Sequence, residues 1–380
     1  MASGLRRFTV VSVATLGGVA LVAAVALWLT TFHPDDVQEE AVVCSAEVPR
    51  VPAGATLRVM TWNVQYMAGK NHVFWYDLLD GSGPDERPAP EEIEATLAAV
   101  ARVIRDEDPD LLLIQEVDDG ASRTDGMDQL QRLLAMVPGK YPCHASAFYW
   151  RAAFVPHPRI MGSVGMKLSV VSKYRIDTAI RHQLALIPAD FVSQQLGLKR
   201  AVLQVQVAVE DGTSVAVMST HLDAFAQGTD TMQRQVNQVA ALLDALDREG
   251  IPWVIGGDFN LLPPGDAYSR LAAEERAYFE PDTELSTLTD RFQSVPALQD
   301  MQGPGAARWY THFPNGGRAT GPDRTIDYLF FSKGTEVGMR YVRASDTLAV
   351  SDHLPVVAEF TRSGPAKVTR SGPEQRPEAR

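Results

Sequence analysis

The sequence has few basic residues relative to acidic ones. Its 380 residues include 35 Lys and Arg against 47 Asp and Glu, which gives a formal net charge of −12 at pH 7. Proteins that wrap long nucleic acids release counterions from the phosphates, and this requires clustered Lys and Arg side chains. The charge therefore argues against such a surface. It does not exclude a nuclease, because an acidic enzyme can hold a phosphodiester through a metal ion and a few local donors.

Cysteine is almost absent, and the chain has no internal repeat of short period. Only Cys44 and Cys143 occur. Two interpretations of this pair stay open: a disulfide between the N-terminal segment and the body of the domain, or two unrelated buried thiols. Hydrophobic residues make up 45% of the chain, which is enough for a substantial core, and nothing in the composition requires a second domain.

Long apolar runs are also missing, except for one near the N-terminus. Residues 8–32 carry no charge, Arg6 and Arg7 precede them, and acidic residues follow. The run is longer than the core of a signal peptide, and no small-residue cleavage pattern directly follows it, which favours a transmembrane anchor over a cleaved signal peptide. The positive charges place residues 1–7 in the cytoplasm as a short stub. We therefore expect a single-pass protein of the cell membrane, with the rest of the chain outside.

The remaining chain divides by composition into three parts. Residues 33–56 contain acids, prolines and a glycine without periodicity, which indicates a linker. Residues 57–361 contain strand-like apolar runs and amphipathic helical patterns, and we expect one domain there. Residues 362–380 are rich in Pro, Gly, Arg and Glu and predict a disordered tail. The fold class is predicted to be α/β: a four-layer sandwich of two packed, mainly antiparallel sheets flanked by helices, with an N-terminal transmembrane helix.

Polar side chains stand at the ends of six of the apolar runs. They are Asn63 in RVMTWNV, Glu116 in LLLIQEV, His221 in VAVMSTHLD, Asp258 and Asn260 in VIGGDFN, Asp327 in TIDYLFF, and Asp352 and His353 in VSDHLP. A carboxylate at the end of a buried strand is costly without a cation, and oxygen ligands are those that Mg²⁺ prefers. The alternative for each residue alone is a strand end that turns into solvent. Together they predict a site for a metal ion and a phosphate.

Two pairs of these residues predict specific chemistry. Asp258 and Asn260 are separated by one residue and point the same way in extended chain, so a carboxylate that can activate water lies beside an amide that can hold a phosphoryl oxygen. The alternative is the start of an ordinary Asp/Asn loop. Carboxylates near His353 can keep its imidazole protonated, and Asp327 is the expected orienting partner.

The ordered motifs TWN, IQE, THLD, GDFN, IDY and SDH resemble those of the endonuclease/exonuclease/phosphatase superfamily, whose members have a DNase I-like fold. The resemblance covers residues 57–361. It implies a Mg²⁺-dependent phosphoesterase, with Mn²⁺ as an alternative ion, that hydrolyses a phosphodiester by in-line attack of an activated water. The catalytic domain would then lie outside the cytoplasmic membrane.

The resemblance also implies a role for each residue. Glu116 would be a metal ligand assisted by Asn63, and Asp352 a second acidic ligand or a group that positions water. Asp258 would activate the water, Asn260 would contact the phosphate, and Asp327 would orient His353, which stabilises the transition state. His221 would bind the phosphate or protonate the leaving oxygen. The other histidines in motif-free positions are expected outside the site, namely His72, His144, His157, His182 and His312.

The substrate is left open by the sequence. The chain lacks the Tyr-Arg that follows the residue equivalent to Asn260 in inositol-polyphosphate phosphatases, and a small-residue run typical of the family is replaced by residues 165–167, where Lys167 is expected to be a solvated strand lysine. A lipid headgroup, as in a GPI-anchor or sphingolipid phosphodiesterase, competes with nucleic acid. A catalytically silent exported binding module is the alternative from a different class. No protein partner is evident, and the membrane is the only further partner expected.

Overall fold

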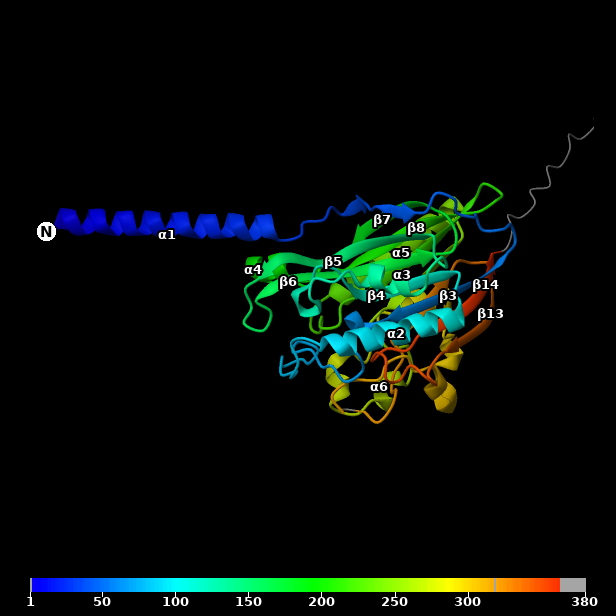
Figure 1. Cartoon of the computed structure of the whole chain (residues 1–380). Coiled ribbons are helices and arrows are strands. Elements are labelled where there is room, and N and C mark those ends of the chain that lie inside the picture. Colours follow the sequence, from blue (N-terminus) through cyan, green and yellow to red (C-terminus); the bar gives the residue numbers. More distant parts are fainter. Residues whose placement is uncertain (1, 318, 363–380) are drawn as a thin grey trace, which may run out of the picture.

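Two seven-stranded sheets pack face to face in this computed structural model, which describes residues 2–317 and 319–362 (Figure 1). Sheet A has the order β13-β14-β3-β4-β6-β5-β2, and sheet B has the order β1-β7-β8-β9-β10-β12-β11. The strands of sheet A are β2 (Val42–Cys44), β3 (Thr56–Asn63), β4 (Leu111–Asp118), β5 (Cys143–Val155), β6 (Gly162–Ser172), β13 (Thr335–Val342) and β14 (Val356–Arg362). Those of sheet B are β1 (Val37–Glu39), β7 (Ile176–Gln183), β8 (Ala201–Ala208), β9 (Ser214–His221), β10 (Trp253–Asp258), β11 (Gln293–Val295) and β12 (Asp327–Phe331).

Each sheet combines one parallel pair with antiparallel neighbours over the described part of the chain. The parallel pairs are β3 with β4 in sheet A and β9 with β10 in sheet B. The prediction of two mainly antiparallel sheets is therefore confirmed. The parallel pairs occupy the middle of each sheet, and each brings two strand ends to the same rim.

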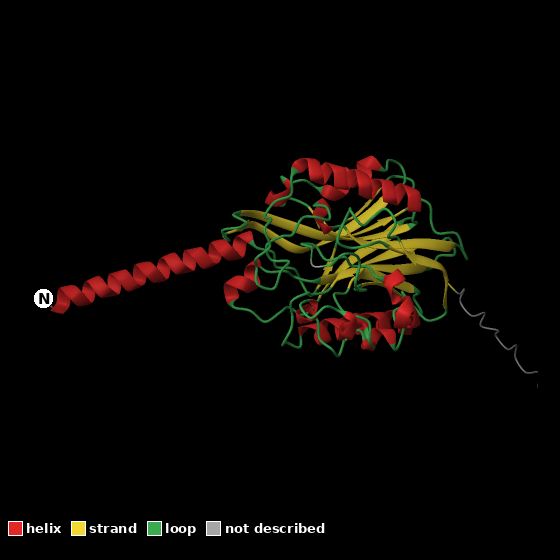
Figure 2. Cartoon of the chain, turned by 90° about the horizontal axis from the view of Figure 1, so that it is seen from below, coloured by secondary structure: helices red, strands yellow, loops and turns green. Residues whose placement is uncertain are grey.

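Helices cover both outer faces of the pair of sheets, as Figure 2 shows. The helices are α1 (Ala2–Thr30), α2 (Pro90–Glu107), α3 (Gln129–Met136), α4 (Phe191–Leu196), α5 (Thr231–Glu249), α6 (Ala267–Arg270) and α7 (Ser286–Thr289). Apolar residues of α2 and α3 pack on sheet A in one core cluster, and those of α5 pack on sheet B in another. A third cluster fills the space between the sheets. The predicted four-layer sandwich is confirmed.

Strand β4 shows how the sequence produces these layers. Leu111 and Leu113 belong to the core between the sheets, whereas Leu112 and Ile114 belong to the core beneath α2 and α3. Alternate residues of a strand point to opposite faces, so a strand buried on both faces must be apolar throughout. Helix α2 starts with proline at its first turn and has acidic residues there, which suits the end of a helix where backbone N–H groups are free.

Helix α1 projects from the domain (Figure 1). Its segment Ser12–Thr30 has a mean hydropathy of 2.1, and none of it is buried against the domain. Nineteen helical residues span about 28 Å, which is close to the thickness of the hydrocarbon layer of a bilayer. The helix begins at Ala2, so the predicted stub of residues 1–7 is not separate from it, and residue 1 lies outside the described residues.

The segment 33–56 differs from the predicted linker because it contains two strands. Strand β1 pairs with β7 at one edge of sheet B, and β2 pairs with β5 at an edge of sheet A. The segment therefore runs along the side of the sandwich and contacts both sheets. Strands of three residues at a sheet edge are too short to show a hydrophobic periodicity, so no pattern in the sequence predicts them. At the other end β14 extends to Arg362, and the rest of the predicted tail, 363–380, lies outside the described residues.

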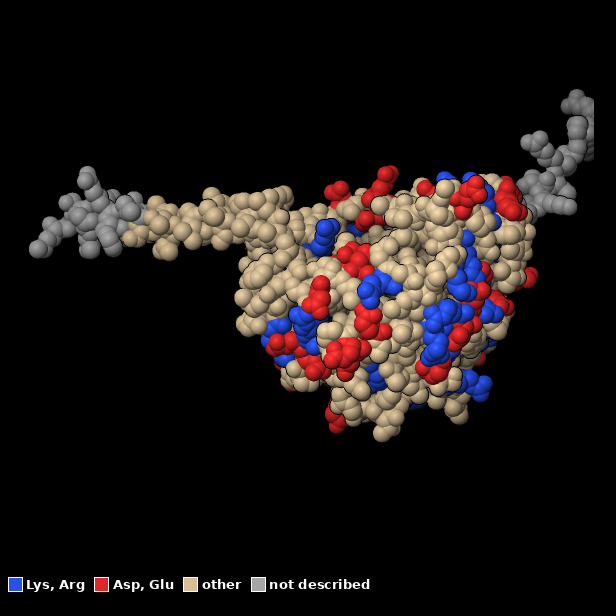
Figure 3. All heavy atoms as spheres, in the orientation of Figure 1, with Lys and Arg blue, Asp and Glu red and all other residues tan. Residues whose placement is uncertain are grey.

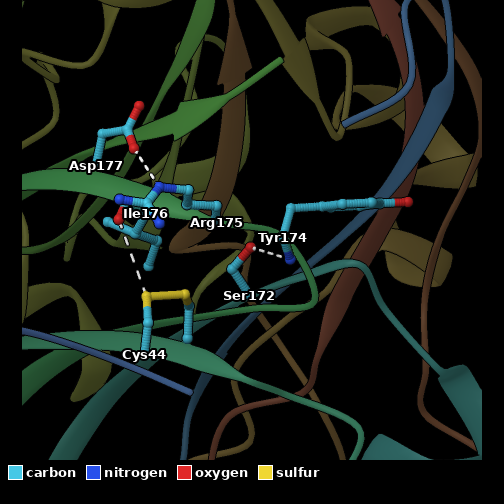
Figure 4. Close-up of a disulfide and its surroundings, with 7 residues drawn as sticks. Cys44, Ser172, Tyr174, Arg175, Ile176 and Asp177 are labelled. Carbon is cyan, nitrogen blue, oxygen red and sulfur yellow. Dashed lines mark hydrogen bonds and ion pairs between the residues drawn. A yellow bond between two sulfur atoms is a disulfide. The ribbon is translucent and has the colours of Figure 1, made fainter. Parts of the chain in front are cut away.

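The two cysteines form a disulfide, which decides between the two interpretations of the pair. Cys44 lies directly opposite Cys143 in the pairing of β2 with β5. Figure 4 shows that Cys44 also lies against β7 of the other sheet, with its sulfur 3.9 Å from the carbonyl oxygen of Ile176. The bond therefore ties the segment that follows α1 to the edge of the sandwich.

Removing this bond is expected to lower the stability of the domain. The disulfide joins residues 99 positions apart, and closing a loop of this length restricts the unfolded chain. For the variant with both Cys44→Ala and Cys143→Ala we expect a loss of about 2–4 kcal/mol in the free energy of unfolding. Denaturant unfolding of the full chain in lipid nanodiscs measures it. Reduced wild type, which keeps both side chains, is the control, and unchanged midpoints for both samples would contradict the expectation.

Candidate active site

The predicted site residues gather at one rim of the sandwich because of how the strands pair. Asn63 ends β3 and His221 and Asp258 end the parallel pair β9 and β10. Strand β12 runs antiparallel to β10, and its first residue, Asp327, pairs with Asp258. A pocket of about 120 Å³ opens at this rim. Six predicted residues line it: Glu116, His221, Asp258, Asn260, Asp352 and His353.

Glu116 reaches the pocket through an irregularity in β4. The pairing of β4 with β6 shifts register between Ile114 and Val117, and Glu116 has a φ of 56°. A positive φ is uncommon for residues other than glycine, and bulges of this kind redirect a side chain. The Glu116 side chain is 18% exposed, and its carboxylate accepts a hydrogen bond of 2.9 Å from Nδ2 of Asn63. The bulge therefore turns a carboxylate on a buried strand toward the pocket.

Asp258 is the centre of the hydrogen-bonded network. Its Oδ2 accepts a bond of 3.1 Å from Nδ2 of Asn63 and lies 3.4 Å from Nε2 of His221 and 3.5 Å from Nε2 of His353. Its Oδ1 accepts the backbone N–H of Asn260 at 2.9 Å. The carboxylate is 2% exposed, so these groups replace the water that it loses on burial.

Two glycines before Asp258 allow the backbone to come close to its neighbours. A Cβ on Gly257 would lie 1.9 Å from the carbonyl oxygen of Thr220 on β9. A Cβ on Gly256 would lie within 2.8 Å of Leu113 on the other sheet and of Leu329 on β12. Only residues without a side chain can occupy these positions. The glycines thus let the two sheets meet at the rim where the site forms.

Asp327 and His353 form a buried ion pair. Nδ1 of His353 lies 2.9 Å from Oδ2 of Asp327. Burial opposes protonation of the imidazole, but the charges of Asp327, Asp258 and Asp352 outweigh it and raise the pKa of His353 well above its usual value. The protonated imidazole is therefore favoured, and its Nε2 lies 3.5 Å from Oδ2 of Asp258. The predicted pairing of Asp327 with His353 agrees with this geometry.

The second imidazole of the site, that of His221, differs from His353 in its charge. Burial, followed by the nearby positive charges of Arg200 and His353, lowers the pKa of His221 well below its usual value. His221 is therefore neutral, and its Nδ1 lies 3.4 Å from the hydroxyl of Tyr149. The site thus holds one cationic and one neutral imidazole on either side of the Asp258 carboxylate.

The acidic residues of the pocket suit a divalent cation. Burial, and next the charge of Asp352, raise the pKa of Glu116, and burial raises the pKa of Asp352. Carboxylates that are costly to ionise next to each other are stabilised by a shared cation, and Mg²⁺ needs only one or two of them. Asn63 turns its amide nitrogen to Glu116, while its Oδ1 accepts the N–H of Gln65 at 3.0 Å. Asn63 is thus placed to hold Glu116 in position.

Two further groups of ligand atoms lie within 4.8 Å of one another among the described residues. One consists of Asp258, Asp327 and His353, and the other of His312, Asp352 and His353. Both groups of ligand atoms include His353. Its carboxylate partners raise its pKa and so favour the protonated imidazole, which cannot ligate a metal. The carboxylates of the pocket that could hold a metal ion without His353 are those of Glu116 and Asp352.

Several residues of the site were missed by the sequence interpretation. His312 was expected outside the site, but its Nε2 lies 3.9 Å from Oδ2 of Asp352 and its ring centroid 4.7 Å from that of His353. Asp77, in the long loop after β3, and Arg200, the residue directly before β8, also line the pocket. None of them belongs to a motif, and each reaches the rim through contacts between distant segments. No signal in the sequence could have found them.

Lys167 was expected to be solvated and is instead 5% exposed. Its ammonium group forms ion pairs with Asp119 at 2.9 Å and with Asp128 at 3.3 Å. It does not line the pocket.

A larger hollow of about 750 Å³ lies between the end of α5 and the turn at 332–335, and none of the site residues lines it. Chemistry therefore assigns the function to the smaller pocket.

The fold and this constellation of carboxylates, amides and imidazoles define a metal-dependent phosphoester hydrolase. Residues 60–353 match the family described as Endonuclease/Exonuclease/phosphatase, and the chain belongs to this family. We found no match to the chain among curated protein sequences.

Solved structures with the same fold come from several organisms. An endonuclease/exonuclease/phosphatase from Beutenbergia cavernae DSM 12333 is 24% identical, over 81% of this chain and 72% of that chain, with a TM-score of 0.53. The human Nocturnin catalytic domain with a bound sulfate anion is 19% identical over 84% of this chain and 97% of that chain, with a TM-score of 0.48. A mannosyl-6-phosphatase of Bacteroides thetaiotaomicron VPI-5482 is 15% identical over 80% of this chain and 99% of that chain, also with a TM-score of 0.48.

The close approach at Gly257 gives a test of how the site is built. In Gly257→Ala the new methyl group would overlap the backbone of Thr220, so β9 and β10 must separate and displace His221 and Asp258. We expect loss of most phosphoester hydrolysis together with a lower unfolding midpoint. Gly305→Ala, where a Cβ meets no atom within 4 Å, is the control and should behave as wild type. Normal activity in Gly257→Ala would show that the rim tolerates separation of these strands.

Proposed function

We propose that the protein is a Mg²⁺-dependent phosphodiesterase that hydrolyses its substrate by in-line attack of an activated water. The observation that carries this proposal is the meeting of Glu116, Asp258 and the Asp327–His353 pair at one rim, in one pocket. A binding module that had lost catalysis would be expected to lack one of these groups. All of them are present and mutually oriented, and the catalytic function is therefore favoured.

Asp258 is the group that we assign to the attacking water. Burial raises its pKa to about 7, so the carboxylate can accept a proton near neutral pH. Nδ2 of Asn63 and the backbone N–H of Asn260 hold the two oxygens of this carboxylate in place. The water oxygen would bond to phosphorus while the bond to the leaving oxygen breaks, and the proton of the water would pass to Asp258.

Cationic groups around the pocket stabilise the negative charge that develops on the phosphoryl group. His353 is protonated and held by Asp327. Arg200 is 5% exposed, and its Nη1 makes no hydrogen bond within the described part of the chain, so it can donate to a phosphate oxygen. Asn260 and the neutral His221 complete the set of donors to the phosphate. A bound divalent ion, held by Glu116 and Asp352, would polarise the phosphoryl oxygens and neutralise part of their charge.

Helix α1 is assigned as a transmembrane anchor. Its length and hydropathy suit a bilayer, and Arg6 and Arg7 before the apolar segment favour a cytoplasmic N-terminus. The catalytic domain would then lie outside the cytoplasmic membrane. The disulfide between Cys44 and Cys143 supports this location, because structural disulfides persist in oxidising compartments.

Removal of divalent metal is expected to abolish activity. The full chain in lipid nanodiscs should hydrolyse bis-p-nitrophenyl phosphate in the presence of Mg²⁺, lose nearly all turnover in EDTA, and regain it when Mg²⁺ or Mn²⁺ is added back. Release of p-nitrophenolate measures the rate. Turnover that continues in EDTA would refute the metal-dependent mechanism, and absence of turnover under every condition would favour the silent binding module.

Substitutions of the two central catalytic groups give the second test. His353→Ala and Asp258→Ala should each lower the rate on bis-p-nitrophenyl phosphate by roughly 10²–10⁴-fold, because they remove charge stabilisation and the proton acceptor. Circular dichroism should show that both variants stay folded. His182→Ala, on β7 and bonded to Gln204 away from the pocket, is the matched histidine control. Rates equal to wild type in either site variant would remove that residue from the mechanism.

A further inference from the structure

A second hollow of about 400 Å³ lies beside the catalytic pocket, and its lining is largely apolar. Its volume falls within the range of roughly 300–1,000 Å³ that is usual for small-molecule sites, whereas the catalytic pocket of about 120 Å³ is smaller. No Lys or Arg lines it among the residues that the structure describes. We call this hollow the apolar groove. The residues that define it best are Trp75, Trp150, Ile160, Ile187, Val192 and Leu198.

The apolar groove adjoins the catalytic pocket. Tyr76 lines both. Asp223 lines the groove, and its Oδ1 accepts a hydrogen bond of 3.1 Å from Nε of Arg200, which lines the catalytic pocket. One ring and one ion pair thus form the boundary between them. A ligand with its phosphate in the pocket would therefore reach the groove with a substituent that passes this ring and ion pair.

The loop that carries Trp75 and Tyr76 is packed onto the domain. The ring of Phe74 is buried and contacts Tyr66 at 6.2 Å between centroids, and Tyr76 contacts the ring of Trp150 at 5.9 Å. The wall of the apolar groove is therefore held by ring contacts from both sides.

The apolar groove lies on the side of the domain from which α1 leaves. Thr31, which follows α1, pairs with Ala152 on β5, and Figure 1 shows α4 and the end of β5 near the base of α1. Figure 3 shows that the surface next to the base of this helix is mostly uncharged. If α1 crosses a bilayer, this side of the domain faces the membrane.

Exposed apolar side chains lie at or next in sequence to Val155, Ile160 and Val192, which line the groove. Phe154 is 45% exposed, Met161 60%, Phe191 58% and Val192 50%. Apolar groups that gather on a surface in this way usually mark contact with a lipid or a partner. They belong to the end of β5, the β5–β6 loop and α4, the same elements that lie at the base of α1. The position of α1 and these exposed apolar side chains thus both favour a lipid as the ligand of the groove.

We propose that the apolar groove binds an acyl or alkyl chain of a membrane phosphodiester whose phosphate lies in the catalytic pocket. This inference rests on the proposed phosphodiesterase function and names its substrate class. A nucleic acid would need basic side chains along its path beyond the pocket, and the groove has none among the described residues. A lipid chain needs apolar walls open to the bilayer, and the groove provides both.

A series of chromogenic substrates tests the proposal. Methyl, butyl and octyl p-nitrophenyl phosphate have the same phosphodiester and the same leaving group, and they differ only in the length of the chain. The full chain in nanodiscs should show kcat/KM for the octyl ester at least about tenfold above that for the methyl ester, because each apolar group bound in such a groove improves recognition. Equal values across the series would overturn the chain-binding role, although the proposed phosphodiesterase function would stand.

Two variants of the groove and one control locate the effect. Val192→Asp places a charge in the groove, and Ala189→Trp fills it, and both positions are exposed, so the fold should tolerate the changes. Both should abolish the preference for the octyl ester and leave the rate on the methyl ester unchanged. Met339→Asp, an exposed apolar position on β13 that does not line the groove, should keep the preference. Preference retained in both groove variants would refute this location.

A binding experiment covers the case in which no substrate is turned over, which would refute the proposed function. An octyl phosphate with a terminal diazirine is cross-linked to the full chain in nanodiscs, and the labelled peptides are mapped by mass spectrometry. Labels on residues 150–160 or 186–198, lost in Val192→Asp and kept in Met339→Asp, would support the groove without any catalytic readout. Labels confined to α1 would contradict it.

Discussion

A buried carboxylate at the meeting point of two sheets is the constraint on which the site depends. Burying the charge of Asp258 is costly unless its oxygens receive hydrogen bonds or a cation. Four groups surround it: the backbone N–H of Asn260 in its own segment and one group from each of three other segments. Gly257 lets the backbones of β9 and β10 approach closely, and Gly256 leaves room for the side chains of Leu113 and Leu329 beside it. The same rim brings Glu116 inward through the bulge in β4. The close packing of the strands at this rim and the placing of the site residues therefore depend on the same two features, the glycines before Asp258 and the bulge in β4.

The imidazoles of His353 and His221 differ in charge because their surroundings differ. Three carboxylates raise the pKa of His353 and outweigh the effect of burial. Burial, followed by the positive charges of Arg200 and His353, lowers the pKa of His221. Two residues of the same type thereby present a cation and a neutral ring to one pocket. Arg200 adds a second fixed positive charge at the wall shared with the apolar groove. This arrangement suits a phosphodiester with a charged centre and an apolar extension, as we propose.

The sequence predicted those parts of the structure that depend on local pattern. The apolar run of β4 and the polar residues at the ends of the strands appear as expected, because strand periodicity depends on neighbouring residues. It could not predict the positive φ of Glu116, which is imposed by pairing with β6. It also placed His312 outside the site, because only a backbone bridge to His353, 41 residues later, brings it there. Lys167 was misjudged for the same reason, since its burial depends on two acidic partners from other segments.

The central claim is that one divalent ion is held at this rim by Glu116 and Asp352. Electron paramagnetic resonance of Mn²⁺ added to the full chain in nanodiscs tests it without any substrate. The account predicts one bound Mn²⁺ per chain that Mg²⁺ displaces, and an affinity at least about tenfold lower in Glu116→Gln, as for loss of a metal ligand. Mn²⁺ bound equally well by wild type and Glu116→Gln, or no bound Mn²⁺ at all, would contradict it.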